Sequence, residues 1–171
     1  MRVSKSLVGK SIVSIADGRM LGPVSDVFLD KGLSQVVAIL TGEEGLWNRK
    51  IHLIKRDDVV LYGVDTVLVK QSNVIHAEEN AAGFDSWIRR DQLHGRNIDT
   101  PGETRIAKLD DVILDEDACV LGFTLGRTYI DSPVAESGAV SRDVIIDTGG
   151  EDGIMTIDLE KAEQEKFHFP T

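Results

Sequence analysis

The sequence contains a single cysteine, no long hydrophobic run and no hydrophobic segment at its start. One thiol, Cys119, cannot form a disulfide within the chain and is typical of a reducing compartment. No apolar run approaches the roughly 20 residues that a membrane-spanning helix needs, and residues 1–6 lack the apolar stretch of a secretory signal. We therefore expect a cytoplasmic protein that does not insert into a membrane.

Positive charge is scarce in the second half of the chain. Residues 1–76 hold ten Lys and Arg against eight Asp and Glu, whereas residues 77–171 hold nine against twenty-one, so the halves carry net charges of +2 and −12. Proteins that bind duplex DNA or anionic membranes draw their affinity from clustered Lys and Arg. The local acidity therefore disfavours both kinds of partner.

Motifs for catalysis, metal binding and nucleotide binding are also missing. The four histidines are scattered, with no pair at the i,i+4 spacing of a helical zinc site. The glycine-containing stretches 42–45 and 122–126 lack the lysine of a phosphate-binding loop. Cys119 lies in an apolar stretch near acidic residues, which disfavours a nucleophilic thiolate. We predict no enzyme activity and no cofactor, and leave open a weak cation site at residues 115–117.

The composition that is present is that of a globular protein. Hydrophobic residues make up 42% of the chain and charged residues 28%, so a buried core is expected. A length of 171 residues suits one ordinary domain or two small ones.

An internal repeat organises the chain. Ten identities occur in the same order in both halves. They are Leu7, Gly9 and Ile12 with Leu93, Gly95 and Ile98 at an offset of 86, and Asp26, Val27, Leu29, Asp30, Leu40, Asp58 and Val59 with Asp111, Val112, Leu114, Asp115, Leu125, Asp143 and Val144 at an offset of 85. The collinear order indicates two copies of one small domain. The predicted boundaries are 1–76 for the first copy, 77–90 for a linker, 91–158 for the second copy and 159–171 for a C-terminal helix and tail.

Each copy is predicted to consist of short strands joined by turns. Residues 12–15 lead into Asp17-Gly18, a strong tight-turn dipeptide, and residues 22–30 alternate between two faces. Short strands with hardly any helical periodicity favour an all-β fold of two tandem small β-barrels. The expected cores are Ile12, Val27, Leu29, Val37, Ile39, Leu53 and Val59 in one barrel and Ile98, Val112, Leu114, Leu121, Phe123 and Val144 in the other.

Two segments outside the copies have helical character. Large apolar side chains at spacings of three and four predict a short docked helix within residues 78–90, and the charge order of residues 158–166 predicts a short C-terminal helix. Apolar residues that a core does not need often mark an interface, so we predict a two-fold homodimer. In the rival interpretation, linker and tail fold back onto the two barrels. The residues concerned are Phe84, Trp87, Ile88, Phe167 and Phe169.

One spaced pattern runs through the first copy. It consists of Leu7-x-Gly9-Lys10-x-Ile12, Asp17-Gly18, Gly22-x-Val24-x-Asp26-Val27-x-Leu29-Asp30, an apolar strand through Leu40, and Asp58-Val59. In this pattern the chain resembles the PRC-barrel domain family, small β-barrels found in the cytoplasmic part of the photosynthetic reaction centre and in the C-terminal domain of ribosome maturation factors. The second copy is similar but departs from the pattern, with residues 101–103 in place of the Asp-Gly turn and Lys108 near the position of Pro23.

The resemblance implies a fold more than a function, because one fold hosts many functions. Since such barrels mostly act as adaptors, we expect a non-enzymatic protein-interaction or adaptor module. The alternative is an RNA- or ribosome-associated maturation factor, which the net charge of −10 disfavours. A small-ligand or metal-binding protein is a further, weaker alternative.

The repeated carboxylates are predicted to be structural. Asp26 and Asp30, like Asp111 and Asp115, stand four residues apart on a strand, which separates them by about 13 Å and prevents one metal from joining them. We interpret them as solvent-facing and turn-entering residues.

One aromatic and basic stretch stands out as a candidate contact site. It contains Trp47, Arg49, Lys50, Lys55 and Arg56. Trp and Arg are favoured at binding hot spots, and Trp can also stack on a base. We predict that this stretch contacts a protein partner, with RNA less favoured; alternatively, Trp47 closes one open end of a barrel.

Overall fold

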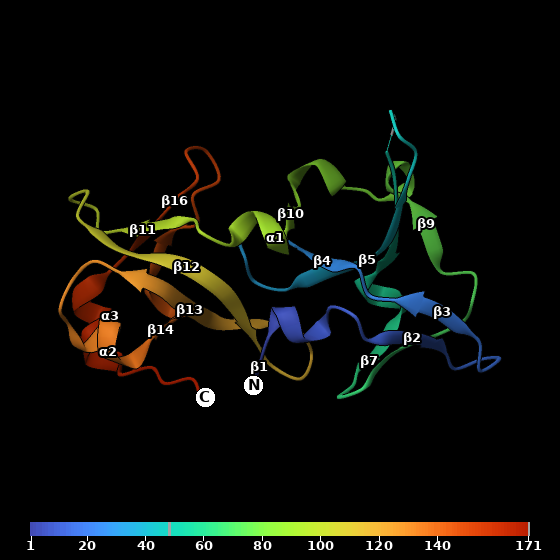
Figure 1. The fold of residues 1–171 in the computed structure, drawn as a ribbon, viewed down its shortest axis with the longest axis horizontal. Helices are drawn as coiled ribbons and strands as arrows, with labels where there is room; N and C mark the ends of the chain where they lie inside the picture. Colours follow the sequence, from blue (N-terminus) through green and yellow to red (C-terminus); the bar gives the residue numbers. More distant parts are fainter. Residues whose placement is uncertain (48, 171) are drawn as a thin grey trace.

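The chain folds into a mostly β structure, as the sequence predicts. The computed structural model describes residues 1–47 and 49–170. Figure 1 shows two strand-rich halves, the first coloured blue to green and the second yellow to red. The strands of the described residues form three sheets, of seven, five and four strands.

The first half contributes the four-stranded and the five-stranded sheet. Its strands are β2 (Ser11–Ser14), β3 (Met20–Pro23), β4 (Asp26–Leu29), β5 (Val36–Glu44), β6 (Lys50–Lys55), β7 (Val59–Tyr62), β8 (Thr66–Val69) and β9 (Ile75–Ala77), and β10 (Ile88–Arg89) comes from the linker. The sheet orders are β3-β2-β8-β7 and β10-β4-β5-β6-β9. The predicted hairpin around Asp17-Gly18 is confirmed, because β2 and β3 pair antiparallel.

The second half forms the seven-stranded sheet. Its strands are β11 (Asn97–Asp99), β12 (Arg105–Leu114), β13 (Val120–Thr128), β14 (Ala139–Ser141), β15 (Ile145–Asp147) and β16 (Ile154–Ile157). They follow the order β14-β13-β12-β11-β16-β15, and the N-terminal strand β1 (Arg2–Val3) adds to β12. The long strand β12 pairs with both β11 and β13, so it corresponds to β3 and β4 together.

The helical segments are short. They are η1 (Ser4–Leu7), η2 (Arg56–Asp58), η3 (Glu78–Asn80), η4 (Phe84–Ser86), α1 (Arg90–Leu93), α2 (Pro133–Ser137), η5 (Arg142–Val144) and α3 (Leu159–Glu165). The predicted C-terminal helix is confirmed as α3, and the Asp158 side chain caps it by accepting a hydrogen bond from Lys161 N. The linker forms two 3-10 turns, η3 and η4, in place of the predicted helix, because Gly83 between them adopts a left-handed conformation with φ of 84°.

The strand pairing repeats along the chain. In the first half β2 lies parallel to β8, with Ile12 opposite Val67. In the second half β11 lies parallel to β16, with Ile98 opposite Met155. Each of these parallel pairs is flanked by an antiparallel neighbour, β7 or β15. The two halves therefore share one pairing pattern at an offset close to that of the sequence repeat.

The structure corrects the register of this repeat by one residue. Asp26 faces Leu40 across β4 and β5, whereas Asp111 faces Thr124 across β12 and β13. The counterpart of Leu40 is therefore Thr124 and not Leu125. The shift arises because the turn between the paired strands is one residue shorter in the second half.

One hydrophobic core runs through both halves, where the sequence predicts two separate cores. The main cluster of buried hydrophobic residues extends from Leu7 to Ala162. Of the predicted core residues, those that are buried are Ile12, Val27, Leu29, Ile39, Leu53, Ile98, Val112, Leu114, Phe123 and Val144, and those only partly buried are Val37, Val59 and Leu121. In β5, alternation between a buried and an exposed face does not identify the core residues, because residues from both faces of the strand are buried.

Each half lends its N-terminal arm to the other. β1 pairs with β12 of the second half, with Val3 opposite Ile113. β10 pairs with β4 of the first half, with Arg89 opposite Phe28. The two arms hold equivalent places in the repeat, directly before η1 and α1. The exchange is reciprocal, as in a strand-swapped dimer.

The halves also meet through the turns that follow β4 and β12. Val36 N donates a hydrogen bond to Ala118 O at 2.9 Å, and Val120 N donates one to Ser34 O at 2.8 Å. These two bonds are equivalent under the repeat. Buried backbone groups at the ends of the strands are thus paired across the junction between the halves.

Candidate protein-interaction site

The hairpin formed by β5 and β6 projects from the first half of the molecule (Figure 1). Its tip presents two large hydrophobic side chains, Leu46 and Trp47, which are 94% and 96% exposed. Gly45 enters the tip with φ of 103°, a conformation that glycine adopts without strain. Trp47 therefore makes almost no contact with its own chain, and the alternative that it closes a barrel end is wrong.

Charged residues flank the tip. Arg49 forms an ion pair with Glu43 at 3.3 Å and remains 73% exposed. Glu43 is also paired with Arg89 of β10, and Lys50, opposite Glu44 in the ladder, is exposed. An ion pair with so exposed an arginine contributes little to stability, so Arg49 can exchange it for a contact with a partner. Lys50 is available to a partner because it is exposed.

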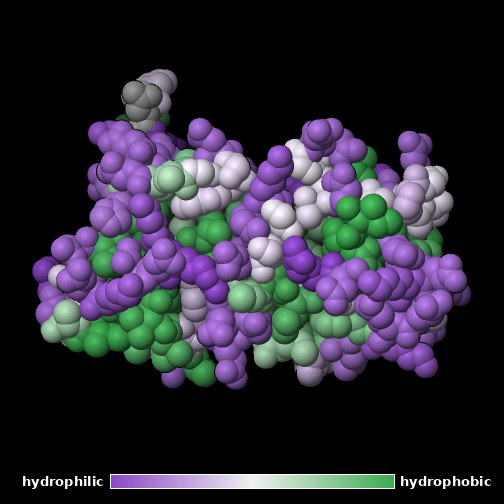
Figure 2. Space-filling view, turned by 180° about the vertical axis from the view of Figure 1, so that it is seen from behind, coloured by the Kyte–Doolittle hydropathy of each residue, from purple (hydrophilic) through white to green (hydrophobic). Residues whose placement is uncertain are grey.

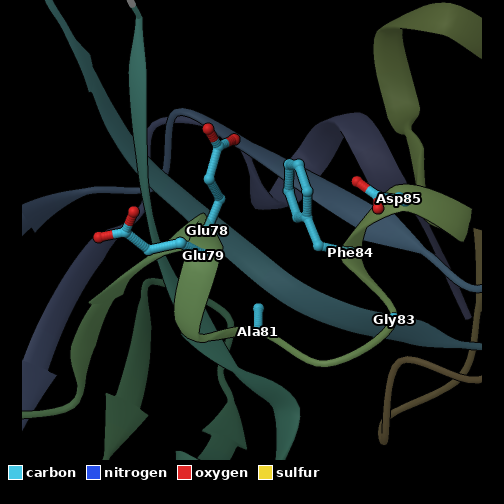
Figure 3. Close-up of a pocket in the computed structure, with 6 residues that line it drawn as sticks. All are labelled: Glu78, Glu79, Ala81, Gly83, Phe84 and Asp85. Atoms are coloured by element: carbon cyan, nitrogen blue, oxygen red, sulfur yellow. The ribbon is translucent and has the colours of Figure 1, made fainter.

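An acidic pocket with one aromatic wall opens beside this hairpin. It has a volume of about 370 Å³ and is lined by Glu78, Glu79, Ala81, Gly83, Phe84 and Asp85. Figure 3 shows the Glu78 side chain and the Phe84 ring standing side by side, with Asp85 beyond the ring. Within the described part of the chain, none of the three carboxylates takes part in an ion pair. We call these six residues the acidic pocket.

The aromatic wall belongs to a cluster on the outer face of the five-stranded sheet. The Phe84 ring meets Phe28 of β4 edge-on, with centroids 5.4 Å apart, and meets Trp87 with centroids 5.8 Å apart. Such edge-to-face pairs add stability beyond the area they bury. Buried Ala38, Leu40 and Leu53 of the sheet complete the cluster. The linker is thereby docked, and the pocket has a fixed wall.

The hairpin and the acidic pocket lie on neighbouring segments. β9 pairs with β6, with His52 opposite Ala77, and η3, which carries Glu78 and Glu79, follows β9 directly. Figure 3 shows strands of the five-stranded sheet rising beside the two glutamates. The acidic pocket therefore lies beside the hairpin, and the basic, aromatic tip lies further along the same hairpin.

The structure separates the five predicted partner contacts into two groups. Trp47, Arg49 and Lys50 lie at the tip, and Lys55 and Arg56 lie at the opposite end of β6. The second group lines a cavity of about 270 Å³ together with Trp87 of the linker. Arg56 donates hydrogen bonds to Val36 O at 2.7 Å and to Asp117 O, so its guanidinium group joins the two halves.

The five residues predicted to mediate self-association are partly buried within the chain. They are Phe84, Trp87, Ile88, Phe167 and Phe169. The first two belong to the aromatic cluster, and Ile88 packs against the main core. The Phe167 ring lies so close to Gly122 of β13 that an added Cβ would stand 2.9 Å from it. This packing agrees with the interpretation in which linker and tail fold back onto the two halves.

Two of the repeated carboxylates are buried, although the sequence predicts them to face solvent. Asp26 and Asp111 are only 2% and 6% exposed. Asp26 accepts hydrogen bonds from Arg89 Nε at 3.2 Å and from Arg90 Nε at 2.7 Å. Burial alone would lower the pKa of Arg89, but its hydrogen bond to Asp26, the nearby charge of Asp91 and its hydrogen bond to Glu43 outweigh burial and raise it. Arg89 of the exchanged arm and Arg90 of α1 thus bring the positive charges that pair with Asp26.

A second apolar area lies at the end of the molecule that carries β2, β3 and β7. Figure 2 shows hydrophobic side chains gathered over this end, and exposed members include Val60 and Leu61 on β7 and Val64 in the following turn. β7 is an edge strand, but a bulge between Val59 and Leu61 interrupts its ladder. Bulged edges are poor templates for strand addition, so the hairpin is the stronger candidate site.

Among residues 1–47 and 49–170, no helix is both long and apolar enough to cross a membrane. In the same ranges, no group of three or more His, Cys, Asp and Glu side chains is placed to hold a metal ion. No protein-family model matches the chain, and no curated protein matches its sequence. The PRC-barrel resemblance therefore rests on the spaced residues of the first half.

No sequence pattern predicts the acidic pocket. Glu78, Glu79 and Asp85 lie in a segment that the sequence predicts only as a linker. The signal that was present is the grouping of these three carboxylates around Phe84, in a segment expected to be docked. Their convergence depends on the bend at Gly83 and on the packing of Phe84 against the sheet, which no sequence pattern specifies.

Proposed function

We propose that the protein is a non-enzymatic protein-interaction module and that the β5–β6 hairpin binds its partner. The observation that carries this proposal is the 96% exposure of Trp47 at the hairpin tip. Trp and Arg are enriched among the few residues that supply most of the binding free energy of protein interfaces. Burial of an exposed indole by a partner also removes a large apolar surface from water.

The anchoring of the hairpin supports this role. β5 and β6 pair from Ala38 opposite Lys55 to Glu44 opposite Lys50, so the strands are ordered almost to the tip. Glu43 ties the hairpin to Arg89 of β10. A contact element that is already ordered loses less conformational entropy on binding. Trp47 is therefore presented on a rigid support.

Each half of the chain, in this proposal, is a PRC-type β-barrel in a cytoplasmic adaptor. Support comes from the spaced glycines of the family pattern: Gly9, Gly18 and Gly22 have φ values of 88°, 67° and 103°. Side chains are strained in this region of backbone space, which glycine occupies freely. The lone thiol of Cys119 suits a reducing compartment.

Site-specific photo-crosslinking in native cells tests the role of the hairpin. A photoreactive amino acid replaces Leu46 at the tip, and the matched control places it at Val64, an apolar residue that is 83% exposed in the turn between β7 and β8. Adducts are analysed by mass spectrometry with and without nuclease. We expect a discrete protein adduct from position 46 that is absent from position 64, resists nuclease and disappears in Trp47→Ser.

Two outcomes would decide against this proposal. A nuclease-sensitive adduct at position 46 would favour the RNA-associated alternative, in which Trp47 stacks on a base. Equal adducts at positions 46 and 64, or none at either, would show that the hairpin is not a binding element.

A further inference from the structure

We infer that the hairpin tip of one chain docks into the acidic pocket of a second copy of the same chain, forming a two-fold dimer with two equivalent contacts. The inference rests on the proposed function, because it takes the hairpin to be the binding element and names its partner. Of the five residues predicted for the homodimer contact, only Phe84 takes part in it, as the aromatic wall of the pocket, and the opposite side of the contact is the hairpin tip.

The chemistry of the two surfaces is complementary. The tip offers the indole of Trp47 and two cations, Arg49 and Lys50. The acidic pocket offers the Phe84 ring and three carboxylates that have no ion-pair partner among the described residues. Indole and phenyl rings attract each other in edge-to-face or offset geometry, and opposite charges around them orient the docking. The volume of about 370 Å³ lies in the range of pockets that enclose a ligand group.

The tip of each chain is free to enter a pocket on a second chain. Trp47 is 96% exposed, so the tip does not fill the pocket of its own chain. Hairpin and pocket nevertheless lie side by side, because β6 pairs with β9 immediately before η3 (Figure 3). A two-fold axis between two such molecules brings each tip to the other's pocket, which closes the assembly at two chains.

The repeat itself restricts the contact to the first half of each chain. The second half has no counterpart of the tip, because the connection from β13 to β14 contains the helix α2 in place of a tight hairpin. Up to residue 170 the second half also has no counterpart of η3 and η4, because α3 follows β16. With one tip and one pocket per chain, a two-fold axis engages both surfaces of each chain with the same partner, so the proposed assembly closes as a dimer.

Charge-swap complementation measured by sedimentation equilibrium tests the inference. The tip variant carries Arg49→Glu and Lys50→Glu, and the pocket variant carries Glu79→Lys and Asp85→Lys. All four swapped side chains are exposed, Arg49 to 73%. Folding should therefore be preserved, and thermal unfolding of each variant will verify this. Each variant alone sets like charges against each other in both contacts. Their equimolar mixture restores opposite charges in both contacts of the heterodimer.

We expect the wild-type chain to dimerise, each variant alone to associate at least roughly tenfold more weakly, and the mixture to recover the wild-type affinity. Trp47→Ser, which keeps every charge, should weaken the dimer as well.

A dimer that survives in both variants, or a mixture of folded variants that does not recover the wild-type affinity, would overturn the inference. A monomeric wild type would also overturn it; the proposed function would then stand if position 46 cross-links to a different protein in cells and fall if it cross-links to none.

Discussion

Gln35 and Cys119 form an antiparallel β-bridge between the two halves of the chain. They occupy equivalent positions in the repeat, and the reciprocal backbone hydrogen bonds between the two turns flank them on both sides. An approximate two-fold axis therefore passes through this bridge. The same symmetry relates the exchanged arms, β1 and β10. The chain is thus built like a strand-swapped dimer joined into a single polypeptide.

A cut in the linker should leave the two halves associated. A protease site inserted between Ala82 and Gly83 separates residues 1–82 from 83–171, but β10 then still pairs with β4 of the other fragment and β1 still pairs with β12. The shared core also spans both fragments. We expect the nicked fragments to co-elute in size-exclusion chromatography without denaturant. Separate elution of two folded fragments would show that each half is independently stable.

Removal of the Asp26 carboxylate should strongly destabilise the fold. Asp26→Ala leaves the guanidinium groups of Arg89 and Arg90 without their buried partner, and breaking such a pair costs about 3 kcal/mol or more of unfolding free energy. The measurement is urea-induced unfolding followed by circular dichroism. Asp65→Ala, at an exposed position, serves as the control and should change stability by less than about 0.5 kcal/mol.

The equivalent change in the second half should cost less. Within the described part of the chain, Asp111 accepts hydrogen bonds from Ser4 Oγ and from the backbone N–H groups of Lys5 and Val112, and from no guanidinium group. Asp111→Ala therefore leaves neutral donors unpaired, which costs about 1–3 kcal/mol. If Asp111→Ala proves more destabilising than Asp26→Ala under the same conditions, the two carboxylates do not act as proposed.

Gly122 should not tolerate a side chain, whereas another glycine of β13 should. A Cβ at position 122 would lie 2.3 Å from Val140 O and 2.9 Å from the Phe167 ring. We expect Gly122→Ala to cost about 1–3 kcal/mol through overpacking and to release Phe167 from the sheet. At Gly126 the nearest atom would be 3.6 Å away, so Gly126→Ala should be nearly neutral. Thermal unfolding compares the two, and equal midpoints would contradict the packing at Gly122.

Alkaline pH should destabilise the protein through Tyr62. Burial raises the pKa of its phenol to about 12, against about 10 in an unfolded chain. The unfolded state therefore releases this proton first, and stability falls as pH rises from about 10 towards 12. Tyr62→Phe should remove this loss and, because the buried hydroxyl has no hydrogen-bond partner among the described residues, should be nearly neutral at pH 7. The control is Tyr129→Phe at an exposed position; an unchanged alkaline loss in Tyr62→Phe would contradict the assignment.

Acidic pH should destabilise the turn at Asp30. Burial raises the pKa of this carboxyl, but hydrogen bonds from the Ser34 side chain and from the backbone N–H groups of Ser34 and Gln35 outweigh burial and lower it. The stabilisation is therefore present above about pH 4, the unfolded pKa, and is lost as pH falls through the lower folded pKa. Unfolding measured from neutral to acidic pH should show a smaller loss for Asp30→Asn than for the wild type. Asp131→Asn, at an exposed position, should retain the full loss.

Much of the fold follows from local sequence features. Strand positions are marked by β-branched and apolar residues, the first hairpin by Asp17-Gly18, and the repeat by identities that occur in the same order along one chain. These signals suffice because strand alternation and tight-turn chemistry act over a few residues. The position of Trp47 in a loop and the docking of the linker were also open to prediction from such patterns, whereas the exposure of Trp47 was not.

Only the tertiary structure decided how the two halves combine and where the candidate site lies. The exchanged arms are strands of two residues held by backbone hydrogen bonds. Because such bonds do not depend on the identity of the side chains, the sequence does not mark these strands. The burial of Asp26 depends on Arg89 and Arg90, more than 60 residues away. The acidic pocket likewise forms because the bend at Gly83 places Phe84 against Phe28. Local patterns determined the elements, whereas pairing between distant segments, which leaves no periodic trace in the sequence, determined the shared core and the site.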